Sequence, residues 1–177
     1  LVAWTEFQKR PASEEEIKAW FKQWPKANIG VVTGKISNLL VLDLDAKHNR
    51  SSKEFKIPVT ICSNTGGGGE HIFFQYPNFE VRISAGVILG LGVDIRGEGG
   101  YVVLPPSLHQ SGKYYEWRES CSPFDLEPAE IPEWLKDNLQ EYSKGSSKKL
   151  YKKDPLSVME GTRNETAASV AGKIIST

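Results

Sequence analysis

The stretch LVLDLDAKHNR, residues 40–50, combines a strongly apolar strand with two carboxylates. Alternate residues of a strand face the same side of a sheet, so Asp43 and Asp45 are expected side by side, with Leu42 and Leu44 on the other face. Two like charges held so close repel each other, and charges inside such a strand are rare without partners. The pattern therefore predicts a positive partner between the carboxylates. Solvation of both at a strand end is the alternative.

The overall composition excludes several classes of protein. In 177 residues, 22 Lys and Arg balance 22 Asp and Glu, so the chain as a whole has no field that attracts polyanions indiscriminately. No apolar run is long enough to cross a membrane. Cys62 and Cys121 are too few for a disulfide framework or a cysteine-rich zinc site. We expect a cytoplasmic protein with reduced thiols, no structural zinc and no membrane partner.

Short β-rich runs fill the middle of the chain, with a helical pattern on either side. Ser13 and Glu16 form a capping box at the start of the first helix, whose aromatic side is expected to be core, and Pro25 ends it. A second helix is predicted over residues 131–142. The strands are predicted within residues 28–34, 39–45, 59–65, 71–76, 92–97, 101–106 and 113–118. This order predicts an α+β domain with a largely antiparallel sheet.

The composition changes after this domain. Residues 144–160 are polar, rich in lysine and without periodicity, which is typical of a linker. Thr162 and Glu165 then form another capping box at the start of an apolar helical pattern. We therefore expect a core over residues 1–143, a linker over 144–160 and the beginning of a helical module over 161–177.

A third carboxylate, Asp94, lies in the run GVDIRGEGGYVVLPP, residues 92–106, close to Arg96. Asp43, Asp45 and Asp94 could meet on one sheet face and hold one or two Mg²⁺ or Mn²⁺ ions, because hard cations prefer oxygen ligands. Two such ions, about 3.5–4 Å apart, would activate an attacking oxygen and neutralise a phosphate leaving group. The alternative places Asp94 in an ordinary turn.

A run of four glycines, Gly66 to Gly69, lies in SNTGGGGEHIFF, residues 63–74. Glycine backbone can approach a ligand closely, and successive N–H groups can bind an anion, although a flexible hairpin is an equally good interpretation. His71 follows and could donate a hydrogen bond to a phosphate. The run GVVTGK, residues 30–35, does not match a P-loop, but Lys35 remains a candidate phosphate contact.

Other polar and aromatic residues have weaker signals. His48 and His109 lie in polar loops without a second ligand at metal spacing, so both are expected at the surface. Tyr114, Tyr115 and Trp117 could stack on bases, but alternation along a strand explains them equally well.

Three motifs in order, VLDLD, SNTGGGGEH and GVDIRGEGGYVVLPPS, resemble the primase-polymerase (prim-pol) family of the archaeo-eukaryotic primase superfamily. The upstream run FQKRPASEEEIKAWFKQWPKANIGVVTGKISN is also similar to the family, so the resemblance covers residues 1–142. It implies a core of two modules, one with a sheet like that of an RNA-recognition motif, and an active site between them. It also implies that the N-terminal part of the smaller module is absent here.

The resemblance implies template-directed nucleotidyl transfer by a DNA primase/polymerase, with release of pyrophosphate. Its substrates would be dNTPs or NTPs, with a single-stranded DNA template and a primer, and a C-terminal helical or helicase region of the same protein could be a further partner. Asp43, Asp45 and Asp94 would hold two Mg²⁺ or Mn²⁺ ions. The nucleotide contacts implied are His71, Ser63, Thr65, Gly66, Gly67, Gly68, Gly69 and Arg96.

Two other functions are compatible with the same residues. A metal-dependent phosphodiesterase or nuclease would use the carboxylates with water as the nucleophile. A non-catalytic module would bind single-stranded nucleic acid through its sheet and loops.

Overall fold

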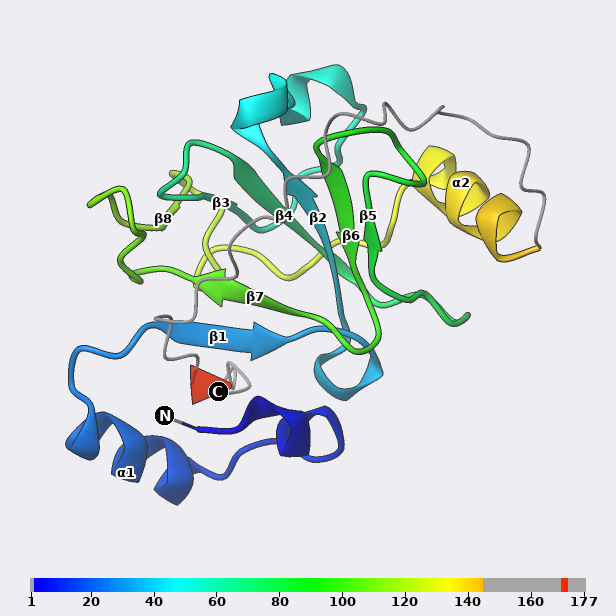
Figure 1. The fold of residues 1–177 in the computed structure, drawn as a ribbon. Helices are drawn as coiled ribbons and strands as arrows, with labels where there is room; N and C mark the ends of the chain where they lie inside the picture. The colour runs from blue at the N-terminus through cyan, green and yellow to red at the C-terminus, as the bar shows by residue number, and fades with distance from the viewer. Residues whose placement is uncertain (1, 145–169, 172–177) are drawn as a thin grey trace, which may run out of the picture.

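The structure is a computed structural model that describes residues 2–144 and 170–171 (Figure 1). These residues form two sheets and two α-helices, α1 (Glu14–Gln23) and α2 (Glu133–Ser143). The strands are β1 (Ile29–Val32), β2 (Leu39–Leu44), β3 (Cys62–Asn64), β4 (Glu70–Gln75), β5 (Ser84–Ala85), β6 (Val93–Arg96), β7 (Tyr101–Leu104), β8 (Glu116–Trp117) and β9 (Val170–Ala171). Short 3-10 helices are η1 (Trp4–Gln8), η2 (Lys35–Ser37), η3 (Ala46–His48) and η4 (Ser52–Glu54).

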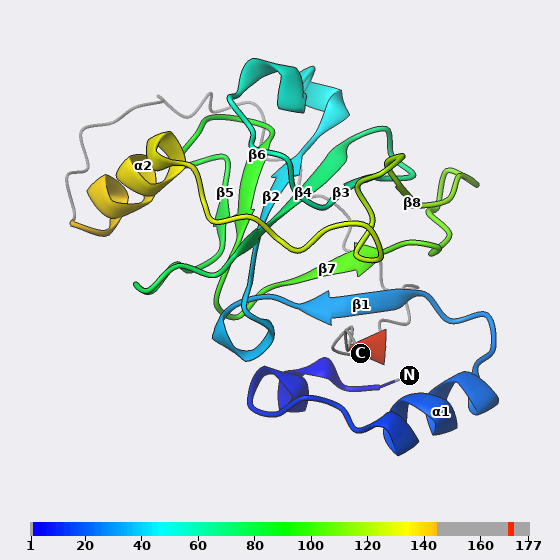
Figure 2. The ribbon, with the colours of Figure 1, turned by 180° about the vertical axis from the view of Figure 1, so that it is seen from behind.

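The larger sheet is antiparallel and has the strand order β5-β6-β2-β4-β3-β8. One face of β2 presents Leu40, Leu42 and Leu44, all of which are completely buried. The helix α2 and the segment that leads to it lie on this side of the sheet (Figure 2), and Leu135 and Leu139 of α2 join the same apolar cluster. Burial of each leucine stabilises the fold by about 1.5–3 kcal/mol, so this face fixes the register of β2.

The other face of the larger sheet is covered only in part. Val41 of β2 and Phe73 of β4 pack against Val31 and Val102 of the smaller sheet, whose strand order is β7-β1-β9. Asp43 lies two residues after Val41 on the same side of β2, and there the apolar cover has ended. The edge of the smaller sheet therefore leaves a polar part of the larger sheet open.

The N-terminal segment packs against the smaller sheet. The capping box of α1 is present as predicted, with Ser13 and Glu16 each accepting the backbone N–H of the other. Phe7 of η1 and Val32 of β1 form an apolar cluster against which Ile17 and Trp20 of α1 are partly buried. The aromatic side of α1 therefore belongs to the core, as expected, although no residue of this helix is fully buried.

The mixed helical and antiparallel architecture agrees with the predicted α+β class. Each predicted β-rich run corresponds to a strand, and the second predicted helix is α2. The sequence pattern missed β5, a two-residue edge strand that pairs with β6. Its Ser84 and Ala85 have no apolar alternation by which a strand could be identified.

The predicted linker and C-terminal helix lie almost wholly outside the described residues. Within the expected helix, Val170 and Ala171 form β9, which pairs parallel with β1. Across the described part of the chain, neither α-helix has the length and apolar character that a bilayer crossing requires.

Candidate active site

The predicted motif residues meet in one row across the larger sheet. Asp43 of β2 lies directly opposite Asp94 of β6 and His71 of β4, and His71 lies opposite Ser63 of β3. Ala85 of β5 and Trp117 of β8 complete the row at its two ends. Directly opposed residues of neighbouring strands share a face, so all three motifs contribute to the same side of the sheet.

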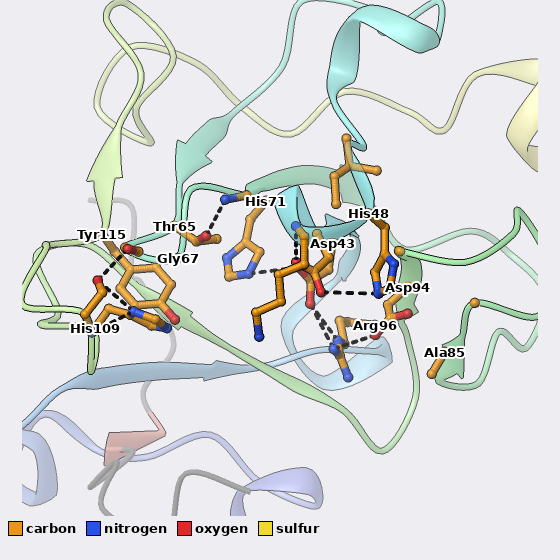
Figure 3. A pocket seen from close by; sticks show the side chains of 18 of the residues that line it. Asp43, His48, Thr65, Gly67, His71, Ala85, Asp94, Arg96, His109 and Tyr115 are labelled. Carbon is orange, nitrogen blue, oxygen red and sulfur yellow. Dashed lines mark hydrogen bonds and ion pairs between the residues drawn. The ribbon is translucent and has the colours of Figure 1, made fainter. Parts of the chain in front are cut away.

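A cleft of about 630 Å³ opens over this row (Figure 3). Asp43, Asp94 and His71 form part of its floor, while Ala85 and Thr65 lie toward opposite ends. The basic side chains that line the cleft are Lys47, His48, His71, Arg96, His109 and Lys113. This mixture of carboxylates and basic groups suits a ligand that carries phosphates together with cations.

Arg96 connects the two carboxylates of the row. Its Nη2 atom donates to Asp43 Oδ2 at 2.8 Å and to Asp94 Oδ2 at 2.9 Å, and its Nε atom donates to Asp43 Oδ2 at 3.2 Å. Burial alone would raise the pKa of Asp43, but the hydrogen bond to His71 and the charges of His71 and Arg96 outweigh it and lower this pKa to about 2. Burial and the nearby charge of Asp43 instead raise the pKa of Asp94, against the opposing effect of Arg96. A positive partner is therefore present, but it is an arginine between Asp43 and Asp94 and not a group between Asp43 and Asp45 as expected.

Asp45 does not lie beside Asp43 in the strand, so that prediction is wrong. The strand β2 ends at Leu44, and Asp45 is the N-cap of η3, where its Oδ1 accepts the backbone N–H of Lys47 at 2.9 Å. Asp45 Oδ2 lies 4.0 Å from His48 Nε2, and the side chain is 46% exposed. Asp45 nevertheless lines the same cleft as the other two carboxylates.

His71 and Ser63 provide buried polar atoms next to the carboxylates. His71 Nε2 lies 3.5 Å from Asp43 Oδ1, and the residue is only 5% exposed. His71 Nδ1 and Ser63 Oγ are both buried without a hydrogen-bond partner among the described residues. Ser63 is completely buried beneath the cleft and does not line it.

The glycine run connects β3 to β4 as a tight hairpin and also lines the cleft. Thr65 closes the loop, because its N–H donates to Gly69 O at 2.8 Å and its Oγ1 accepts the Gly69 N–H at 2.9 Å. A Cβ atom at Gly69 would lie 2.2 Å from Leu44 O, and Gly68 has a φ of +89°, so both positions favour glycine. The cleft is lined by Thr65, Gly66, Gly67 and Gly69 but not by Gly68. Both interpretations of this run, hairpin and ligand-facing loop, are therefore compatible with the fold.

A second loop, residues 107–115, folds over the glycine run. Ser111 Oγ donates to Gly66 O at 2.7 Å, and His109 N–H donates to Lys113 O at 2.8 Å. The ring of Tyr115 lies between His71 and His109, with centroid distances of 5.9 and 6.0 Å. This loop forms the end of the cleft that carries Thr65 and Gly67 (Figure 3).

Several cleft residues were not identified from the sequence. His48 and His109, expected at the surface, both line the cleft, as do Lys47, Lys113 and Tyr115. Tyr115 has a signal as a candidate for base stacking. For the others the sequence signal is proximity to the motifs: residues 47 and 48 follow the Asp-x-Asp pair, and the loop 107–115 follows the third motif.

Lys35, in contrast, is not brought to the cleft. It begins η2 at the turn between β1 and β2, and its backbone N–H donates to Glu98 Oε2 at 3.0 Å. It is absent from the residues that line the cleft.

The donor chemistry of the cleft fits a divalent metal, but the side chains are arranged around an arginine. Asp43, Asp45 and Asp94 supply carboxylate oxygens, which are the ligands that Mg²⁺ and Mn²⁺ prefer. Among the described residues, no three His, Cys, Asp or Glu side chains are grouped closely enough to hold an ion. Arg96 already satisfies Asp43 and Asp94, so binding of an ion requires these side chains to rearrange.

Comparison with known proteins identifies the family. The family model for the bifunctional DNA primase/polymerase N-terminal domain (Prim-Pol) matches residues 2–134, a range that contains the whole cleft. No curated protein matches the chain. With three quarters of its length matched, including all three motifs in the row, the chain belongs to the Prim-Pol family of DNA primase/polymerase domains.

Proposed function

We propose that this domain catalyses template-directed nucleotidyl transfer, in which a 3′-hydroxyl attacks the α-phosphate of a dNTP or NTP and pyrophosphate leaves. The observation that carries this proposal is the single row of Asp94, Asp43, His71 and Ser63, of which the first three lie on the floor of an open cleft. Phosphoryl transfer depends mostly on positioning and charge neutralisation, and the row offers groups for both.

The carboxylate end of the cleft would hold the metal ions. Asp43, Asp94 and Asp45 line this region, and Asp45, whose Oδ2 lies 4.0 Å from His48 Nε2, makes no ion pair with Arg96 among the described residues. Two bound Mg²⁺ or Mn²⁺ ions would supply activation of the hydroxyl and neutralisation of the leaving phosphate. One contribution of the chain is to keep Asp43 ionised, and the low pKa of this residue meets that need.

The opposite end of the cleft would hold the triphosphate. The backbone N–H groups of Gly66 and Gly67 have no partner among the described residues, and Lys113 and His71 lie in the same cleft. Successive free N–H groups of this kind can bind an anion, and the basic side chains add favourable charge. A single-stranded template and a primer would approach through the cleft opening.

Some finer features remain part of the proposal. The division of the core into two modules, with one sheet like that of an RNA-recognition motif, is compatible with the presence of two sheets in the fold. A helical or helicase region C-terminal to this domain would be a further partner in priming.

Primer extension with Asp45→Asn tests the proposed function. Asparagine keeps an oxygen that can accept the Lys47 N–H, so we expect an unchanged melting temperature. Loss of a metal ligand should lower extension about a hundredfold or more. The assay uses a labelled primer on a short DNA template with dNTPs and Mg²⁺ or Mn²⁺.

Asp125→Asn is the matched control for this experiment. Asp125 is also an acidic residue that accepts a backbone N–H, that of Ser122 at 3.1 Å, but it does not line the cleft. The Asp125→Asn variant should extend primers like the wild type. Shortening of the primer in place of growth would indicate hydrolysis, and undiminished extension by Asp45→Asn would contradict the metal role of Asp45.

A further inference from the structure

Arg96 shares one nitrogen between two carboxylates that face each other across neighbouring strands. Its Nη2 lies 2.8 Å from Asp43 Oδ2 and 2.9 Å from Asp94 Oδ2. The side chains of Asp43 and Asp94 are only 23% and 25% exposed, so water screens their charges weakly. Like charges directly opposite each other in a sheet are destabilising, and the guanidinium removes this repulsion.

The position of Arg96 on β6 makes this contact possible. It lies two residues after Asp94, hence on the same face, and opposite Val41 of β2, two residues before Asp43. Arg96 also lines the cleft and is 32% exposed, so its guanidinium has open space on one side. It therefore has room on the cleft side to move away from the carboxylates.

We propose that Arg96 is a resident counter-ion of the Asp43–Asp94 pair, and that a divalent cation binds these carboxylates only in exchange for it. This inference rests on the proposed function for the identity of the cation. A metal ion and Arg96 compete for the same two oxygens, so Arg96 weakens metal binding in the absence of substrate. Once displaced, its guanidinium lies in the cleft, where a phosphate group can take it as a bidentate partner.

The exchange couples metal binding to substrate binding. A triphosphate that pairs with Arg96 frees the carboxylates for the metal, and by linkage the metal favours the triphosphate to the same extent. Couplings of this kind typically change affinity by about 5–150-fold. The domain would thus bind metal tightly only when a nucleotide is present, while its carboxylates stay paired at other times.

Mn²⁺ titration of Arg96→Met tests the exchange without any assay of activity. Methionine keeps much of the length of the side chain but has no charge, so the competitor is removed. We expect Arg96→Met to bind Mn²⁺ at least fivefold more tightly than the wild type in the absence of nucleotide, as measured by the paramagnetic resonance of free Mn²⁺. Arg82→Met is the control, because Arg82 pairs with Glu80 on the exposed surface. The affinity of the Arg82→Met variant for Mn²⁺ should equal that of the wild type.

Thermal unfolding provides a second readout. In the presence of a chelator, Arg96→Met should melt below the wild type, because Asp43 and Asp94 lose their shared partner, and Mn²⁺ should raise its melting temperature by more than it raises that of the wild type. If Arg96→Met does not fold, Arg96→Lys replaces it, since a lysine cannot reproduce the paired Nε and Nη2 contacts with Asp43 and should also bind Mn²⁺ more tightly.

The outcomes separate this inference from the proposed function. Mn²⁺ binding that requires Asp45 but is no tighter in Arg96→Met or Arg96→Lys would overturn the exchange and leave the metal site standing. Absence of Mn²⁺ binding in the wild type and in both Arg96 variants would overturn the exchange and the proposed metal site together.

Discussion

Ser63 and His71 lie directly opposite each other on β3 and β4, and both contain a buried polar atom without a hydrogen-bond partner among the described residues. Ser63 is completely buried and His71 is 5% exposed. Buried polar atoms without partners cost free energy of folding, so this pair reduces stability in the middle of the proposed active site. Such a cost is typical of groups that serve a ligand instead of the fold.

Replacement of Ser63 by alanine should therefore affect stability and binding in opposite directions. Removal of an unpaired hydroxyl should leave the free energy of unfolding unchanged or raise it by up to about 1 kcal/mol. The affinity for a triphosphate should fall about fivefold, because one polar group next to His71 is lost. Urea unfolding and titration with a fluorescent dNTP measure the two effects.

Thr60→Val is the matched control for Ser63→Ala. The hydroxyl of Thr60 is also buried, but it donates to Phe73 O and accepts the Ala129 N–H. Its loss should reduce stability by about 1–3 kcal/mol. Equal destabilisation by the two substitutions would show that the Ser63 hydroxyl is paired within the fold.

Two neighbouring glycines should respond very differently to alanine. A Cβ atom at Gly66 would lie 2.2 Å from His109 Cβ and 2.6 Å from Lys113 O, whereas one at Gly67 would lie 3.5 Å from the nearest atoms of the His109 ring. Gly66→Ala should push the loop 107–115 away and lower stability by about 1–3 kcal/mol, while Gly67→Ala should change stability by less than about 1 kcal/mol. Thermal unfolding compares the two variants, and similar melting temperatures would contradict the close packing of this loop on the glycine run.

Cys62 should make the domain less stable in alkali. Burial raises the pKa of its thiol to about 11, above the value of about 8.5 in an unfolded chain. Between these two values the unfolded state releases the proton and the folded state keeps it, so stability falls as the pH rises from about 8.5 to 11. A pKa difference of about 2.5 units corresponds to about 3.4 kcal/mol at most.

Cys62→Ala isolates this effect. The raised pKa of buried Tyr76 acts in the same direction, but it is common to both proteins and cancels in the comparison. The wild type should lose more free energy of unfolding than Cys62→Ala between pH 8 and pH 11, as measured by urea titration at several pH values. Parallel pH curves would show that the Cys62 thiol ionises normally in the fold.

The sequence allowed prediction of the strands and of Asp43, Asp94 and His71 as one site, because each follows from local patterns and ordered motifs. It did not reveal the row that joins them. That row depends on the pairing of β2 with β6 and β4. Both strands are tens of residues away from β2 in the sequence, and apolar packing on the opposite face of the sheet fixes the register of the pairing.

The errors in the site have local and long-range causes. Asp45 was assigned to the strand because the alternation continues through it, but capping of η3 by its side chain ends β2 one residue earlier. The polar loop of His109 predicts exposure but not a place on the cleft. Long-range contacts bring that loop to the cleft, among them the hydrogen bond between Ser111 and Gly66, 45 residues apart.

His71→Ala should weaken nucleotide binding more than any substitution outside the cleft. The imidazole lies on the floor between Asp43 and the glycine loop, and its ring centroid lies 5.9 Å from that of Tyr115. Loss of a hydrogen bond to a charged phosphate costs about 1.5–3 kcal/mol, so we expect the Kd for a dNTP to rise about tenfold to a hundredfold. Lys35→Ala is the comparison, since Lys35 is also a basic residue but lies at the turn between β1 and β2, away from the cleft. Its Kd should match that of the wild type, and circular dichroism should show both variants folded. An equal rise for both variants would mean that the triphosphate responds to the overall charge of the domain, and His71 would then have no specific contact with it.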